Sequence, residues 1–345
     1  MSLSGSVPVT GSDSPNISLV LTVLNEGENL SRLLDSITRQ TRWPDEVVIV
    51  DGGSTDDSAE ILERWSGDLP LRVLLAPGAN ISAGRNIAIR RAEGDIIAVT
   101  DAGVTLDSTW LERLTDPLID GEEAIDAVGG FFLPDARTTF EHALAATTLP
   151  EVEEICPGAF LPSSRSFAFR RSWFEAGVRY PEWLDYCEDL VLDLRLKRAG
   201  ARFSFAPDAT VRFRPRKSAL AFWRQYYLYA RGDGRAGLFM TRHLARYLTY
   251  VLLAPSFVLV RSPAWRAIVV LGAIVYMRRP IRRLRARGQW HLSEFIGLTM
   301  RTVMLRALGD VAKMAGYPVG LWWRFRTHGI RQDWTSIPDS PDGRD

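Results

Sequence analysis

The chain has 345 residues, 46% of them hydrophobic and 24% charged, with a net charge of +1. These values are ordinary for a folded globular protein and exclude a disordered or fibrous chain. Its two cysteines, Cys156 and Cys187, are too few for a disulfide framework or a cysteine metal site, which predicts reduced thiols.

Charge is divided unevenly along the chain. Residues 201–345 contain 25 Lys and Arg against 8 Asp and Glu, whereas residues 1–200 contain 17 against 33. A basic C-terminal part suits anionic lipid or phosphate. Nucleic acid is not expected as a partner, because the basic residues lie among long apolar runs.

Strand and helix signals alternate four times in the first hundred residues. Short apolar runs rich in β-branched residues predict strands at 17–24, 46–50, 71–75 and 95–100. Helical spacing of apolar residues predicts helices at 28–40, 57–65 and 82–92. This alternation predicts an α/β fold with a mostly parallel, Rossmann-like sheet covered on both faces. Ligands of such sheets bind beyond the carboxyl ends of the strands, so the loops there are the candidate site.

The pattern loosens between about residues 108 and 240. We expect a loop-rich stretch at 133–164 and helices at 108–119, 186–199 and 217–230. Further strands are expected at 125–132, 165–170, 202–206 and 209–213.

The most apolar segments lie in the C-terminal third, at 247–260 and 264–277. Each is about 14 residues long, below the ~20 that span a bilayer upright. Arginines flank both runs, which fits a transmembrane hairpin with both ends in the cytoplasm, a pair of interfacial helices, or a buried hairpin. The absence of a signal-peptide pattern at the N-terminus likewise predicts a catalytic part facing the cytoplasm. We therefore expect four regions: a tail at 1–16, a catalytic domain at 17–240, a helical membrane-associated region at 241–330 and a tail at 331–345.

The first two loops carry polar residues rather than phosphate-binding glycines. The loop from Leu24 to Asn29 lacks both the G-x-G-x-x-G pattern and the Walker lysine, which argues against a dinucleotide enzyme and an ATPase. Asp51 ends the second predicted strand before two glycines. A carboxylate at that place can accept a hydrogen bond from a base or a ribose hydroxyl.

Five blocks along residues 16–240 resemble the family-2 glycosyltransferases of the A-type fold. They are Asn25-Glu26, then V-D-G-G-S-T-D-D-S at 50–58, S-A-G-R-N-I-A-I at 82–89, G-D-I-I-A-V-T-D-A at 94–102, and Glu188-Asp189. The aromatic helix from Gln225 to Gly232 also resembles a family block, with its first basic position replaced by Leu228.

The resemblance implies a role for each matching residue. It places Asn25, Glu26 and Asp51 around the nucleoside, and Arg85, Asn86 and Asp101 around the nucleotide sugar. It makes Asp189 the general base, with Glu188 beside it. A single displacement assisted by one base would invert the anomeric centre. A purely structural alternative is that the two acids cap the following helix.

Two departures from the family pattern concern the diphosphate. The family's Asp-x-Asp reads Asp101-Ala102-Gly103 here, so one metal-binding carboxylate is missing, and no His occurs near Val211. Either Asp101 holds Mg²⁺ or Mn²⁺ weakly, or arginines neutralise the diphosphate instead. The candidate arginines are Arg212, Arg214, Arg216, Arg231 and Arg235.

The expected protein is thus an enzyme that moves a sugar from a nucleoside-diphosphate-sugar donor to an acceptor hydroxyl. Trp183 is a candidate contact for the acceptor sugar. The basic, apolar C-terminal third suggests an acceptor at a membrane, such as a lipid-linked saccharide or envelope glycan. A sugar nucleotidyltransferase and a non-catalytic nucleotide-sugar-binding or scaffold protein are the alternatives.

Overall fold

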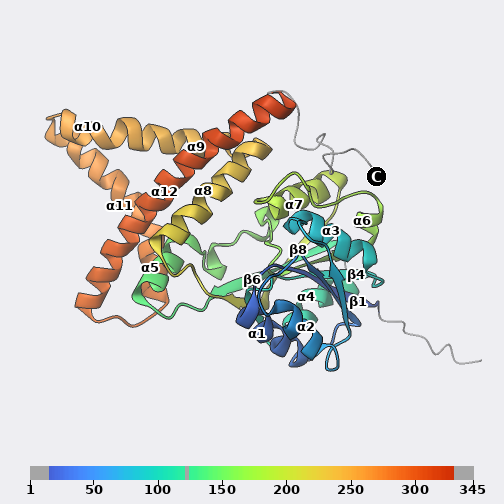
Figure 1. Ribbon diagram of the computed structural model, residues 1–345. Coiled ribbons are helices and arrows are strands. Elements are labelled where there is room, and N and C mark those ends of the chain that lie inside the picture. The colour runs from blue at the N-terminus through green and yellow to red at the C-terminus, as the bar shows by residue number, and fades with distance from the viewer. Residues whose placement is uncertain (1–14, 121–123, 330–345) are drawn as a thin grey trace, which may run out of the picture.

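The computed structural model describes residues 15–120 and 124–329. Its first unit alternates strands and helices in the predicted order. The elements are β1 (Ile17–Val23), α1 (Gly27–Thr38), β2 (Glu46–Asp51), α2 (Ser58–Trp65), β3 (Leu71–Leu75), α3 (Ile81–Arg91) and β4 (Ile96–Val99). β1 pairs in parallel with both β2 and β4, and β2 with β3. The carboxyl ends of these strands therefore meet at one edge of the sheet (Figure 1).

The second unit adds the strands that complete the sheet, and some of them are antiparallel to their neighbours. It contains β5 (Val104–Leu106), α4 (Trp110–Ile119), β6 (Ala127–Pro134), α5 (Thr139–Thr148), two short 3₁₀ turns at 152–154 and 157–159, β7 (Phe167–Arg170), α6 (Ser172–Glu175), α7 (Glu188–Ala199) and β8 (Phe203–Phe213). The eight strands are ordered β3-β2-β1-β4-β7-β6-β8-β5. β7 is antiparallel to both its neighbours, and β5 is antiparallel to β8. The sheet is therefore mixed, and the expectation of a mostly parallel sheet was wrong for this half.

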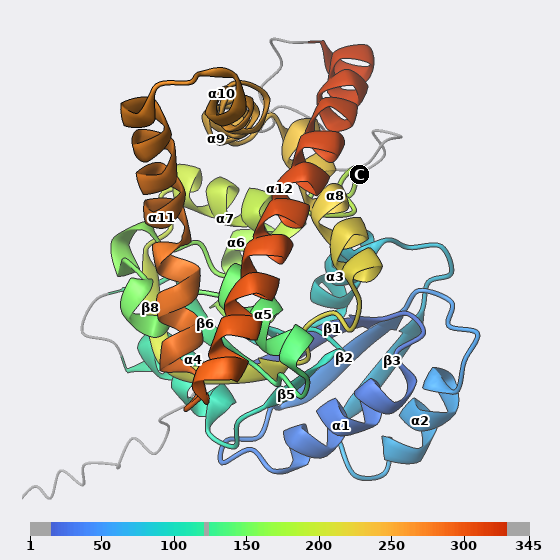
Figure 2. The same cartoon turned by 90° about the vertical axis from the view of Figure 1, so that its left-hand side faces the viewer.

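Two hydrophobic cores lie on opposite faces of the sheet. One joins the strands to α1, α2 and α4 through side chains such as Leu33, Ile61 and Trp110. The other joins them to α3, α6 and α7 through side chains such as Ile89, Phe174 and Leu196. The result is the three-layer arrangement in which helices cover both faces, as the alternation of strands and helices predicted (Figure 2).

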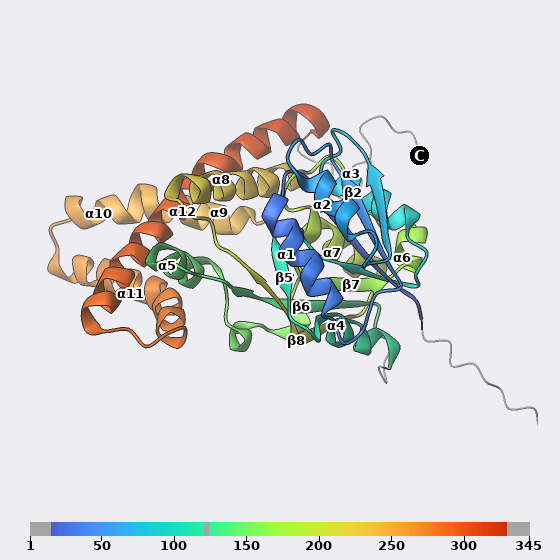
Figure 3. The same ribbon diagram turned by 60° about the horizontal axis from the view of Figure 1, so that its bottom comes forward.

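The C-terminal part is helical: α8 (Ala219–Ala236), α9 (Met240–Tyr247), a π-helical turn η3 (Leu248–Leu253), α10 (Ala254–Leu259), α11 (Pro263–Ala286) and α12 (Leu292–His328). α12 packs along α8, because Gly316 and Gly320 let its backbone approach that of α8 at Tyr227 and Arg231. By contrast, α9, α10 and α11 project away from the sheet (Figure 1, Figure 3).

No helix in residues 15–120 and 124–329 has the length and hydropathy required to cross a membrane. The two apolar runs do not form a transmembrane hairpin. The first is divided between η3 and α10 and ends at Val260, and arginines from Arg278 onward enter the second helix, α11. The expectation of a transmembrane helix was therefore wrong for the described residues.

Candidate active site

The loops after β1 and β2 are tied together by the residues predicted to line the nucleoside. Asn25, whose backbone is left-handed with φ of 55°, accepts a hydrogen bond through Oδ1 from the backbone N–H of Thr55 at 2.8 Å. Asp51 accepts through Oδ1 from the N–H groups of Gly53 and Ser54, at 2.9 and 2.7 Å. Both side chains thus fix the loops at the carboxyl ends of β1 and β2.

Glu26 lies beside these loops, half-buried, and accepts a hydrogen bond from Asn29 Nδ2 at 3.2 Å. Burial raises the pKa of Glu26, the Asn29 hydrogen bond lowers it, the nearby Asp101 raises it further, and Arg216 opposes the rise. Glu26, Asp101 and Arg216 therefore belong to one electrostatic neighbourhood.

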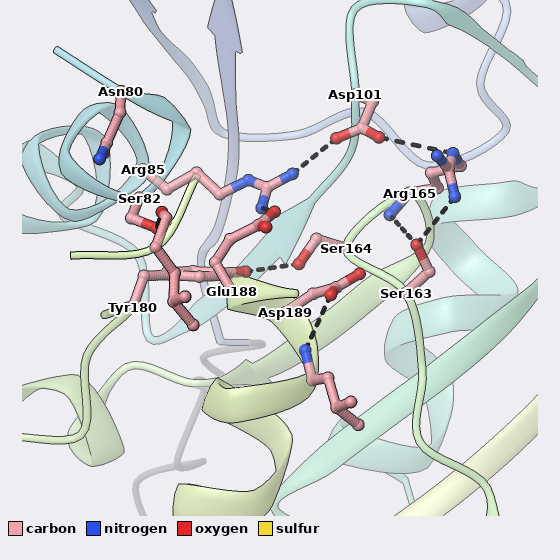
Figure 4. Close-up of polar contacts among 12 residues, drawn as sticks. Asn80, Ser82, Arg85, Asp101, Ser163, Ser164, Arg165, Tyr180, Glu188 and Asp189 are labelled. Atoms are coloured by element: carbon pink, nitrogen blue, oxygen red, sulfur yellow. Dashed lines mark hydrogen bonds and ion pairs between the residues drawn. The ribbon is translucent and has the colours of Figure 1, made fainter. Parts of the chain in front are cut away.

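Arg85 joins two candidate site residues that are far apart in the sequence. Its side chain on α3 is buried, and it donates from Nη2 to Asp101 Oδ1 at 2.6 Å and from Nη1 to Glu188 Oε1 at 2.8 Å. Figure 4 shows the guanidinium between the two carboxylates. The planar fork of arginine suits this bridge. The blocks at 82–89, 94–102 and 188–189 thus converge on one place.

Asn86, predicted as a nucleotide-sugar ligand, contacts the protein with both side-chain atoms. It is fully buried, donates from Nδ2 to the carbonyl of Tyr180 at 2.9 Å, and accepts from the N–H of Tyr180 at 3.0 Å. Its Nδ2 also donates to Glu182 Oε1 at 3.0 Å. Asn86 therefore fixes the segment leading to the Glu188-Asp189 pair.

The two acids open α7. Burial raises the pKa of Glu188 to about 7, with the negative charge of Asp189 adding to the rise and Arg85 opposing it. Asp189 Oδ1 accepts a hydrogen bond from the N–H of Leu190 at 2.8 Å. The pair therefore also stabilises the helix N-terminus, so the capping alternative and a chemical role are compatible.

The candidate diphosphate arginines lie in different surroundings. Arg231 and Arg235 on α8 both face Asp185, with distances of 3.6 and 3.3 Å to its Oδ2. Arg216 is exposed and acts on Glu26 through its charge. Arg214 donates instead to the buried Glu141 Oε1 at 2.8 Å. We therefore leave Arg214 out of the proposed donor site.

Trp183, the candidate acceptor contact, is half-buried against the C-terminal helix. Its ring stacks on that of Trp323 with centroids 6.2 Å apart and an interplanar angle of 11°. Its indole N–H is buried with no hydrogen-bond partner in the described residues. Trp183 thus packs α12 against the segment before α7.

Sequence reasoning missed Arg165 and Tyr180. Arg165 Nε lies 3.6 Å from Asp101 Oδ2, so arginines face both oxygens of that carboxylate. The Tyr180 ring lies under Arg85, 5.1 Å from centroid to guanidinium carbon, and its hydroxyl lies 2.9 Å from Ser164 Oγ. Neither residue belongs to a block with a recognisable spacing, so only the folded chain reveals them.

The residues around Asp101 do not fit a divalent cation site. A hard cation needs several carboxylate or carbonyl oxygens, but Ala102 and Gly103 follow Asp101, and Arg85 and Arg165 face its oxygens. The described residues contain no cluster of three His, Cys, Asp or Glu side chains able to hold a metal ion.

This mixed α/β sheet, with its polar residues at the carboxyl ends of β1, β2 and β4, has the architecture of the A-type glycosyltransferase fold. A family model described as "Glycosyl transferase family 2" matches residues 18–177. Residues 18–177 of this chain therefore belong to this family.

Several relatives support the assignment. The succinoglycan biosynthesis protein ExoA of Rhizobium meliloti is 28% identical over 74% of this chain and 81% of its own. The uncharacterized glycosyltransferase EpsJ of Bacillus subtilis is 28% identical over 60% of this chain, and the O-antigen chain rhamnosyltransferase RfbN of Salmonella typhimurium is 26% identical over 57%. The matches span less than two thirds of the latter two relatives, 63% and 65% of their lengths.

A solved structure shows the same fold. The mannosyltransferase PcManGT of Pyrobaculum calidifontis, in complex with GDP-Man and Mn²⁺, is 18% identical and covers 87% of this chain and 88% of its own. The TM-score is 0.55. The nucleotide sugar and Mn²⁺ are those of that protein.

Proposed function

We propose that this chain is an inverting glycosyltransferase that assembles a cell-envelope glycan at a membrane surface. The convergence of Arg85 on Asp101 and Glu188 carries the proposal, because it joins the predicted donor end of the site to the predicted base. The relatives ExoA and RfbN, named for succinoglycan and O-antigen chain synthesis, support an envelope glycan as the product.

The chemistry follows from the positions of the charges. The nucleoside would lie over the loops of Asn25 and Asp51, at the carboxyl ends of β1 and β2. Asp189 would accept the proton of the acceptor hydroxyl as its oxygen attacks the anomeric carbon. The leaving diphosphate would be stabilised by Arg216, Arg231 and Arg235, whose guanidinium groups form charge-assisted hydrogen bonds to phosphate oxygens.

The acceptor side of the proposal depends on an apolar tip, which we define as residues 248–277 of η3, α10 and α11. Large apolar side chains of the tip are exposed, among them Leu252, Val258, Leu259, Leu271 and Val275. An exposed apolar area of this kind marks an interaction site.

Arginines surround the tip. Arg242 and Arg246 precede it, Arg261 and Arg266 lie within it, and Arg278, Arg279 and Arg282 follow. With Glu153 and Glu154, the last three line a polar cavity of about 360 Å³. Arg246 and Arg282 are paired with Asp310 and Glu154, and the exposed charge of the other arginines favours an anionic bilayer as the partner. We propose that the tip lies in the membrane interface, next to a lipid-linked acceptor. That the catalytic part faces the cytoplasm stays a prediction from the sequence.

The test is release of nucleoside diphosphate by the purified protein from a panel of UDP-, GDP- and dTDP-sugars, with membrane extract as acceptor. We expect one donor to be consumed. Since arginines face both oxygens of Asp101, we also expect most of the turnover to survive a chelator of divalent cations. No release from any donor would contradict the proposal. Complete loss of release in the presence of chelator would show that turnover needs a metal, with Asp101 as its candidate ligand.

A further inference from the structure

The backbone turn before the two acids is strained. Cys187 has a φ of 67°, in the left-handed region that a non-glycine residue adopts at a cost. It is the residue before α7, and Glu188 and Asp189 follow directly. If Cys187 relaxed to an ordinary conformation, both carboxylates would change direction, so the surrounding structure must fix this turn.

α8 supplies the contacts that fix it. The Cys187 thiol lies 3.3 Å from the carbonyl of Tyr229 and 3.4 Å from Asp233 Oδ1. Burial raises the pKa of Cys187, and the Asp233 carboxylate raises it further, so the thiol keeps its proton and donates. Gly232 allows this approach, because a Cβ there would lie 2.5 Å from the carbonyl oxygen of Tyr186.

Asp233 is in turn bound by a buried histidine. His243 Nε2 on α9 lies 3.1 Å from Asp233 Oδ2, and the imidazole stacks on Tyr317 of α12 with centroids 3.7 Å apart. Its other nitrogen, Nδ1, lies 3.1 Å from Arg246 Nη1. Because a guanidinium only donates, Nδ1 accepts and Nε2 carries the hydrogen that is donated to Asp233.

The chain of contacts continues to the apolar tip. Arg246 donates from Nε to Asp310 Oδ1 at 2.8 Å, and Asp310 is 97% shielded from solvent. Tyr250 of η3 donates to Asp310 Oδ2 at 3.1 Å, and Tyr276 of α11 donates to the same oxygen. Polar contacts therefore run without interruption from the turn at Cys187 to the two helical segments that carry the tip.

We propose that Asp233 and His243 are positioning residues that fix the left-handed turn at Cys187 and thereby aim Glu188 and Asp189. Glycine-mediated packing already joins α8 to α12. Burying a carboxylate, an imidazole and a guanidinium at the same place costs free energy unless each is bonded, and here each is. This inference rests on the proposed role of Asp189 only where it concerns turnover.

The first test follows the reactivity of the Cys187 thiol and needs no activity. In a Cys156→Ser background, iodoacetamide reports only on Cys187. Removing a hydrogen bond to a charged group costs about 1.5–3 kcal/mol, so Asp233→Asn and His243→Ala should raise the alkylation rate by roughly tenfold to a hundredfold. His243→Gln, whose Nε2–H can replace that of the imidazole, should restore protection. His142→Ala, which alters the unrelated contact with Trp290, should not change the rate.

The second test separates positioning from donor binding. On a donor that the wild-type protein consumes, Asp233→Asn and His243→Ala should lower kcat by about tenfold or more and leave KM for the donor within about twofold. An unchanged alkylation rate in both variants would overturn the inference whatever the activity. A wild-type protein that consumes no donor would contradict the proposed function, while the alkylation rates would still decide the inference.

Discussion

Glu188 is buried next to Asp189, whose negative charge raises its pKa, and Arg85, whose positive charge lowers it. Its pKa of about 7 lies above the value of 4.5 for an exposed glutamate. Between these two values the folded chain binds more protons at Glu188 than the unfolded chain does. The contribution of Glu188 to the free energy of unfolding therefore falls as pH rises through this window and is level above it.

Comparison with a variant that does not titrate isolates this effect. Relative to Glu188→Gln, the wild-type protein should lose stability between about pH 5 and about pH 8. Urea denaturation of both proteins at the two pH values measures the difference. A difference in stability that does not change with pH would show that Glu188 keeps its ordinary pKa.

Arg85 makes two contacts that a lysine cannot make together. Its Nη2 and Nη1 reach Asp101 and Glu188, whereas an ammonium is a single point charge. Arg85→Lys should lower turnover by about a hundredfold, because the two carboxylates are no longer aligned. Steady-state kinetics on the accepted donor provide the measurement, with Arg90→Lys on the exposed face of the same helix as control. Equal kinetics for the two variants would rule out the bridge as a requirement.

At the scale of elements, the α8–α12 pair depends on glycine. A Cβ at Gly316 would collide with the carbonyl of Tyr227, whereas Gly297 on the same helix has no atom within 4 Å of an added Cβ. Gly316→Ala should therefore lower the free energy of unfolding by about 1–3 kcal/mol. Gly297→Ala should raise it by up to about 1 kcal/mol. Urea denaturation of both variants tests this, and equal stabilities would contradict the close packing.

The elements that sequence predicted well are those with a strong local period. β1 and β2 follow apolar runs, and α1 follows the helical spacing of Leu30, Leu33 and Ile37. The expected strands at 202–206 and 209–213 form one strand, β8. Its pairing with β6 is irregular between Phe205 and Thr210, on either side of Pro207. α5 lies in the stretch expected to be loop-rich, where its alanine-rich sequence has little amphipathic contrast.

The candidate site, like the fold, was predicted from the sequence only in part. Motif order identified Arg85, Asp101 and Glu188, but only folding shows that Arg85 bridges the other two. Arg165, which faces the same carboxylate from the segment before β7, has no periodic signal. Contacts between residues distant in the chain depend on the sheet order, and local patterns do not encode the antiparallel insertion of β7.

At the scale of the whole molecule, the apolar tip lies away from the sheet (Figure 1). We expect the protein to sediment with vesicles that contain an anionic lipid more than with neutral vesicles. Leu252→Glu and Leu271→Glu should abolish that binding, because a charge in the apolar surface opposes insertion. Leu75→Glu alters an equally exposed leucine on β3 and should bind as the wild-type protein does. Equal binding by all three variants would place the membrane contact elsewhere.

The central claim of the proposed function is that Asp189 acts as the base in sugar transfer. The most direct measurement is nucleoside diphosphate release by wild type, Asp189→Asn and the surface variant Asp208→Asn on the accepted donor. We predict that Asp189→Asn lowers kcat by about 10²–10⁴-fold, with donor affinity within about twofold. Asp208→Asn should match the wild-type protein. Turnover by Asp189→Asn at the wild-type rate would contradict the claim.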